Sequence, residues 1–191
     1  MAKRPIFEEV SEPQAAELAS TPPTSIEAPQ GARRAIRAWL WLLFAMVVAM
    51  IALGGLTRLT GSGLSITEWR PLTGALPPMN AADWQAEFER YRQIDQYRLL
   101  NEGMNLGEFQ FIYWWEWSHR QLGRMIGLVW AIGFVWFWLR KQIPAGWVGR
   151  LILPGALGGL QGAIGWWMVH SGLQEGMISV ASHRLATHLG L

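Results

Sequence analysis

The uncharged run AWLWLLFAMVVAMIALGGLT at residues 38–57 decides the fold class, because its length matches the thickness of a bilayer. At about 1.5 Å of rise per residue, a helix of this length spans roughly 30 Å, which is the thickness of the hydrocarbon core. A second apolar run, at residues 114–139, has tryptophans at both edges, as in the aromatic belts of membrane helices. The sequence therefore predicts membrane-spanning helices over both runs.

A third apolar run lies between Arg150 and Glu175, and we place its helix at residues 151–170. Five glycines in this run permit close packing against neighbouring helices; they are Gly155, Gly158, Gly159, Gly162 and Gly165. A fourth helix is predicted to begin near Ser179, and the sequence stops roughly halfway across the bilayer at Leu191. Because a half-span leaves backbone groups unpaired in lipid, we interpret the chain as part of a longer protein. The expected fold is an all-α polytopic membrane bundle of three complete transmembrane helices and the start of a fourth.

Composition supports a membrane protein and narrows the chemistry. The chain is 51% hydrophobic and 16% charged, whereas soluble domains carry about 25% charged residues. A net charge of +2 gives no support for a nucleic-acid partner. The absence of cysteine excludes disulfides, thiolate-ligated iron–sulfur clusters, cysteine zinc sites and covalent c-type haem attachment. Any bound metal must therefore depend mainly on histidine.

The chain divides into a polar tail and a membrane domain. Residues 1–32 are rich in proline and polar residues, which predicts a disordered cytoplasmic tail, and residues 33–191 form the bundle. Basic residues flank the first helix and fill the loop between the second and third helices; they are Arg33, Arg34, Arg37, Arg140, Lys141 and Arg150. By the positive-inside rule these ends face the cytoplasm, and the loop at residues 58–112 faces outward.

The outer loop contains its own amphipathic helix. Asn80 is a suitable N-cap, and Trp84, Phe88 and Tyr91 then fall on one helical face. This stripe suits either a helix that lies on the membrane and covers a site or one that packs on other loops.

His119 and His188 are the leading candidates for function. An ionisable residue within a membrane helix is costly and marks a functional site by default. Both imidazoles fall in the outer half of the bilayer, and neutral imidazoles on two facing helices are a common way to hold porphyrin iron. Gly123 and Gly127 continue the His119 face and leave room for a flat macrocycle. Alternatively, His119 belongs to a buried salt-bridge cluster with its neighbours Glu116 and Arg120.

Other polar residues near these helices have simpler interpretations. We interpret His170 and His183 as structural; His183 is five residues from His188, so the two cannot easily face one iron. Arg184 lies one turn before His188 and could pair with a haem propionate. Arg58 and Arg124 could merely extend their charges toward the membrane surface.

Several segments resemble the haem A synthases, in the long-loop subgroup of alphaproteobacteria and mitochondria. The resemblance covers residues 33–191. It rests on the motifs GGLTRLTGSGLSI (54–66), WRP (69–71), GALPP (74–78), EF (108–109), EWSHRQLGR (116–124), GAIGWWMV (162–169) and RLATHL (184–189). The cysteine pair of the Gram-positive subgroup is missing here, and His183 stands where many relatives have tyrosine.

The resemblance implies an oxidoreductase that converts the C8 methyl of haem O to the formyl of haem A for cytochrome oxidase. Such enzymes have eight helices in two similar halves, each with a histidine pair. By motif, His119 and His188 would ligate the substrate haem iron in the N-terminal half, and Glu116 would be the catalytic carboxylate. We expect Arg58, Arg120 and Arg184 to contribute to haem binding. The other half would hold haem b, so we expect the present chain alone to be inactive.

Two other functions stay open. A bis-histidine b-type cytochrome that only transfers electrons needs the histidines but not Glu116, and a membrane scaffold needs neither. The resemblance further implies a multi-pass protein of the bacterial inner membrane, surrounded by lipid. It is compatible with a homo-oligomer and with a contact to haem O synthase. The sequence does not identify the electron acceptor.

Overall fold

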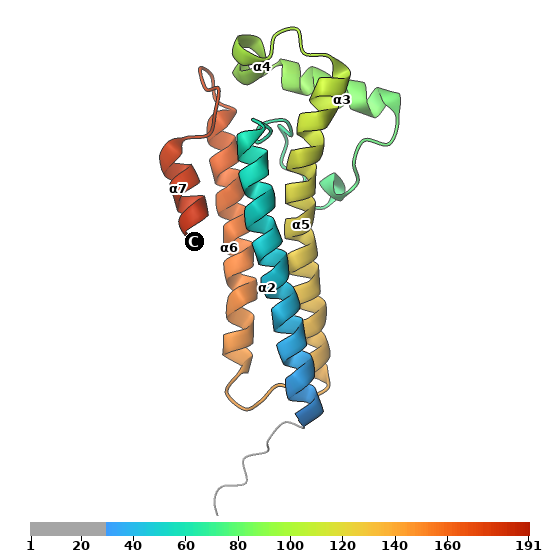
Figure 1. Cartoon of the computed structure of the whole chain (residues 1–191), viewed down its shortest axis with the longest axis vertical. Coiled ribbons are helices and arrows are strands. Elements are labelled where there is room, and N and C mark those ends of the chain that lie inside the picture. Colours follow the sequence, from blue (N-terminus) through green and yellow to red (C-terminus); the bar gives the residue numbers. More distant parts are fainter. Residues whose placement is uncertain (1–29) are drawn as a thin grey trace, which may run out of the picture.

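The computed structural model describes residues 30–191, and every regular element in this range is helical (Figure 1). Three long helices form the bundle: α2 (Gln30–Leu59), α5 (Leu106–Leu139) and α6 (Val148–Gly172). The short helix α7 (Ser182–Gly190) runs back beside α6. The all-α bundle is as predicted. The expected disordered tail falls almost entirely outside the described residues, and α2 begins at Gln30, three residues before the expected boundary.

Each long helix contains one of the predicted apolar runs and extends beyond it. α2 and α5 are long and apolar enough to cross a membrane, with mean hydropathies of 2.3 and 1.6 over their most apolar windows. α6 contains the whole of the predicted third run, and its 25 residues cover about 37 Å. Among the described helices, α6 is not one of those that meet the same hydropathy threshold. α7 starts three residues later than predicted.

α2 and α5 are joined by a tryptophan seated on a glycine. The indole of Trp39 lies so close to Gly133 that an added Cβ would sit 2.2 Å from its Nε1 atom. The same Nε1 donates a hydrogen bond to the carbonyl of Val129, at 3.0 Å. Because Gly133 has no side chain, the ring packs directly on the α5 backbone, and its polar N–H is satisfied away from water.

α5 and α6 repeat this arrangement. Trp130 of α5 lies over Gly155, where an added Cβ would sit 2.2 Å from the ring. Its Nε1 donates to the carbonyl of Leu151, at 2.9 Å. In both pairs the accepting carbonyl belongs to the residue four positions before the glycine, so one turn of helix provides both the space and the acceptor.

A layer of shorter helices covers one end of the bundle (Figure 1). It contains the 3-10 turn η1 (Thr73–Ala75), α3 (Ala81–Arg92) and α4 (Asp95–Leu100). Asn80 caps α3 as predicted, by accepting from the Asp83 amide at 2.9 Å. The α3 stripe turns inward rather than to lipid, because Phe88 and Tyr91 are buried against Phe109 of α5. Of the two predicted roles, packing on neighbouring segments is therefore the observed one.

The covering layer also explains why α5 begins before the predicted span. Asn105 and Glu108 form a capping box that starts α5 at Leu106 rather than at Trp114. The added two turns carry Phe109 and Tyr113, which pack against α3. The helix therefore extends beyond the bilayer because it has a protein surface to contact there.

Candidate functional site

His119 and His188 lie on different helices, and each ring is seated on a glycine of a neighbouring helix. A Cβ on Gly54 of α2 would lie 3.1 Å from Nε2 of His119. A Cβ on Gly165 of α6 would lie 3.0 Å from Cε1 of His188. The two glycines make space for the rings that the sequence predicted as a pair. That both rings bind one iron stays a prediction.

The hydrogen-bonding capacity of both rings is largely unused by the protein. Nδ1 of His188 is buried and has no hydrogen-bond partner among residues 30–191. His119 makes no hydrogen bond or ion pair within the same range, so the predicted alternative, in which it joins a salt-bridge cluster, does not describe it. A buried imidazole nitrogen without a partner is costly unless it binds something else. The ring of His188, and that of His119 without a protein partner, could therefore each bind a haem iron, whose other ligands come from the porphyrin.

A site for a bare metal ion is not indicated. The described residues contain no group of three or more histidine, cysteine or carboxylate side chains that could enclose a metal ion. A protein that supplies only two imidazoles suits a metal that arrives with most of its ligands already bound.

Glu116 is buried and fully hydrogen-bonded. Its side chain is 3% exposed, and Oε2 accepts from the Ser65 hydroxyl at 2.7 Å and from the Ile66 amide at 2.8 Å. Oε1 accepts from Nε of Arg120 at 3.0 Å and also from its Nη2. Arg120 donates in turn to the Ile66 carbonyl, at 2.9 Å. Glu116 and Arg120 therefore fasten the segment after α2 to α5, while His119 faces α2.

The other predicted haem-binding arginines differ in their availability. Arg184 donates to the backbone carbonyl of Trp167 at 2.7 Å. Its guanidinium also lies 4.4 Å from the centre of the Trp167 ring. Its Nε is buried without a partner. Arg58 is exposed at the end of α2, and the described residues offer it no partner. Arg184 therefore holds α7 to α6, whereas Arg58 is free to bind an anion. A contact of either with a propionate stays a prediction.

The remaining histidines have structural surroundings. His170 is exposed, and its ring lies 6.5 Å from that of Trp166. His183 is exposed against the edge of Trp167, at 6.1 Å. Neither ring lies over a glycine of another helix. These positions agree with the structural roles expected for them.

The position of α7, and hence of His188, depends on contacts that sequence reasoning missed. The Ser171 hydroxyl accepts from the Ala181 amide at 2.9 Å, across the turn between α6 and α7. A Cβ on Gly172 would lie 2.7 Å from Leu64 and 3.1 Å from the Val180 amide nitrogen. Leu64 is only 2% exposed. The segment after α2 therefore packs into the turn that aims α7.

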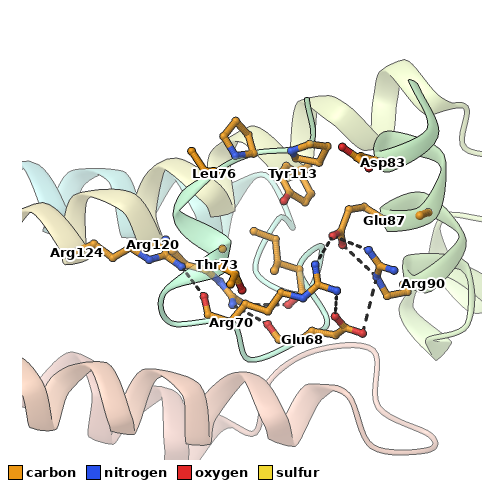
Figure 2. A pocket seen from close by; sticks show the side chains of 15 residues that line it. Glu68, Arg70, Thr73, Leu76, Asp83, Glu87, Arg90, Tyr113, Arg120 and Arg124 are labelled. Atoms are coloured by element: carbon orange, nitrogen blue, oxygen red, sulfur yellow. Dashed lines mark hydrogen bonds and ion pairs between the residues drawn. The ribbon is translucent and has the colours of Figure 1, made fainter. Parts of the chain in front are cut away.

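A cavity of about 330 Å³ lies between α5, α3 and the segment around η1 (Figure 2). Its charged side chains form a network: Glu87 binds Arg70 at 3.1 Å and Arg90 at 2.6 Å, and Glu68 also pairs with Arg70. Arg120 reaches its wall, but neither His119 nor His188 lines it. The cavity is therefore distinct from the imidazole pair.

Comparison with known proteins gives one consistent result. Residues 37–191 match a protein family described as cytochrome oxidase assembly protein. The chain is similar to heme A synthases of Ruegeria sp. strain TM1040 (66% identity), Ruegeria pomeroyi (67%) and Paracoccus denitrificans (64%). Each alignment covers 100% of this chain and 50–51% of the relative. The chain thus spans about half the length of these curated relatives. No solved structure matches it.

Proposed function

Because this chain belongs to the cytochrome oxidase assembly protein family, we propose that it forms the haem O-binding half of a haem A synthase. The observation that carries this proposal is the pair of imidazoles on α5 and α7, each seated on a glycine, with Nδ1 of His188 buried and unpartnered. The complete protein would oxidise the C8 methyl of haem O to the formyl group of haem A. It would lie in the bacterial inner membrane with its N-terminus in the cytoplasm.

His119 and His188 would bind the haem iron from its two sides. The haem itself supplies the methyl group that is oxidised. If both imidazoles held the iron, they would leave no open position on it for oxygen. We therefore propose that water supplies the oxygen atom, that haem b in the other half carries electrons away, and that haem O is received from haem O synthase.

Glu116 would accept a proton released from the methyl group. Each of its carboxylate oxygens already accepts two hydrogen bonds, so a proton can be taken only when one donor moves. The Ser65 hydroxyl is the donor that can rotate away, because it also lies 3.4 Å from the Ile112 carbonyl, which offers a second acceptor. Glu116 would therefore combine two roles, proton acceptor and fastening point for the segment after α2.

Replacement of Glu116 with glutamine tests the first role. We expect Glu116→Gln to retain bound haem and to lower the yield of haem A by about 10²-fold or more, because a neutral amide cannot act as a proton acceptor in place of the carboxylate. The yield is measured by extracting haem from membranes and identifying it by mass. Glu108→Gln, at the exposed capping box of α5, serves as the control and should keep the yield. An unchanged haem A yield in Glu116→Gln would exclude Glu116 as the proton acceptor.

The filled hydrogen bonds of Glu116 also favour a second candidate, a b-type cytochrome in which this carboxylate is purely structural. The same extraction separates the two functions. A synthase accumulates haem O or haem A, whereas the cytochrome yields only haem b. Recovery of haem b alone from the intact, active protein would favour electron transfer.

Gly172 is expected to determine how α7 is placed and hence how the His188 ring is oriented. In Gly172→Ala, the new methyl group would press against Leu64 and the Val180 amide, so the start of α7 must shift. We expect weaker haem retention and altered g-values of the low-spin iron by electron paramagnetic resonance. Gly162→Ala is the matched control on α6, since a Cβ there meets no atom within 4 Å. Identical spectra in both variants would show that the turn does not position His188.

A further inference from the structure

The segment that joins α2 to α3 does not stay in the covering layer. It descends along α5, so that η1 lies beside that helix, well below α3 (Figure 1). Its backbone is bound there by Arg124 of α5, whose Nε donates to the Pro71 carbonyl at 2.9 Å and whose Nη2 donates to the Arg70 carbonyl at 3.0 Å. A Cβ on Gly74 would lie 3.0 Å from the same guanidinium.

The depth of Arg124 in the membrane can be estimated from the position of Gly123, the residue before it. Gly123 faces Met50 of α2, and Met50 lies seven residues, or about 10 Å, inside the end of the uncharged run at Thr57. An arginine on a helix leans about one turn, roughly 5 Å, toward the N-terminal end of that helix. The carbonyls that Arg124 binds therefore lie about 5 Å inside the uncharged run, at the edge of the hydrocarbon core.

Non-helical backbone at this depth needs hydrogen-bond partners that lipid does not provide. Arg120 and Arg124, one turn apart on α5, supply them. Arg120 donates to the Ile66 carbonyl at 2.9 Å and to the Glu68 carbonyl at 3.5 Å, and Arg124 donates to the Arg70 and Pro71 carbonyls. Figure 2 shows both side chains extending from α5 toward the segment around Arg70. The two arginines thus replace water as partners of an irregular segment.

Side chains of the segment separate by polarity. Arg70 points toward α3, where it pairs with Glu87 (Figure 2). Leu72 and Leu76 are instead 84% and 73% exposed. Both leucines are thus largely uncovered by protein, although Leu76 is also one of the residues that line the cavity. Exposed leucines at the edge of the hydrocarbon core suit contact with lipid.

We propose that residues 69–79 insert into the membrane and that Leu72 and Leu76 contact lipid acyl chains in the leaflet next to the α3–α4 layer. The occupant of this surface is lipid rather than a protein, because α2 and α5 also expose apolar side chains near this depth, among them Ile51 and Met125. The Arg70–Glu87 pair marks the boundary with the headgroup region.

The chain contains no cysteine, so single cysteines can report the depth of this segment. Leu72→Cys and Leu76→Cys are made in the intact protein, labelled with a fluorescent maleimide and placed in phosphatidylcholine nanodiscs, whose two faces are both accessible. Gln85→Cys, exposed on α3, is the control. Unsubstituted protein, treated in parallel, gives the labelling background. Retention of bound haem verifies that each variant is folded.

Lipids brominated on the acyl chain should quench the labels at residues 72 and 76 at least about twofold more than the label at residue 85, because such quenching needs close contact. Aqueous iodide should show the opposite order. Equal iodide quenching at all three positions would overturn the proposal, because the segment would then lie in water. Protection of residues 72 and 76 from both quenchers would also overturn it, because protein would then cover them.

A second variant tests the arginine. In Arg124→Gln the Pro71 and Arg70 carbonyls lose their charged donor, so we expect the label at residue 72 to become more accessible to iodide. Unchanged quenching of that label in folded Arg124→Gln protein would show that Arg124 does not hold the segment in the membrane.

Discussion

Replacement of His188 with alanine is expected to remove the haem bound by this part of the protein, whereas replacement of His183 should leave it in place. Both residues belong to α7. Only His188 is seated on a glycine of α6 and has a buried ring nitrogen without a partner. His183 is exposed against Trp167. The two variants therefore separate loss of an iron ligand from loss of any imidazole in α7.

The expected loss is large, because the proposed site has two iron ligands and His188→Ala removes one of them. It is measured as the loss of the low-spin optical and paramagnetic resonance signals of a bis-imidazole haem. Free imidazole should partly restore these signals, since the substitution leaves a space of the right size over Gly165. His119→Ala should behave as His188→Ala does. If both histidine variants keep the full low-spin signal, the haem assignment fails.

The two glycines beneath tryptophan rings are expected to be the most sensitive positions for stability. Gly133→Val and Gly155→Val should each lower the free energy of unfolding by at least about 2 kcal/mol. In each case an added Cβ would lie 2.2 Å from an indole ring that is also hydrogen-bonded to the facing helix. The ring cannot retreat without losing that bond, so the helices must separate.

Gly158→Ala is the matched control for these variants. It lies on α6, three residues from Gly155, and a Cβ there meets no atom within 4 Å. We expect it to be neutral or to stabilise slightly, because alanine favours helix over glycine. Stability is measured as the midpoint of thermal or detergent-induced unfolding. If Gly155→Val unfolds at the same midpoint as Gly158→Ala, the indole contact does not hold α5 against α6.

Much of this fold could be predicted because the bilayer imposes its thickness on the sequence. The uncharged run at residues 38–57 indicated α2, and the charges after Leu139 indicated where α5 ends. Asn80 indicated the start of α3, because its capping hydrogen bond is local and involves a residue only three positions later. His119 and His188 were identified because ionisable groups are rare within membrane helices.

The sequence could not indicate partners that come from distant segments. Glu116 and His119 are three residues apart, and spacing alone left open whether they act together. The structure separates them: Glu116 faces Ser65, and His119 faces Gly54. The sequence could not indicate that Gly54 contacts an imidazole, because a glycine in an apolar run can equally well serve helix packing.

The sequence by itself therefore determined the helical class, the positions of the long helices in the chain and the choice of the two candidate histidines, because each follows from local hydrophobicity, charge and spacing. The tertiary structure alone decided which glycine lies beneath which ring, how Arg120 and Arg124 hold an irregular segment against α5, and how Leu64 aims α7. Those contacts join residues far apart in the chain, and their energies arise only when the helices pack.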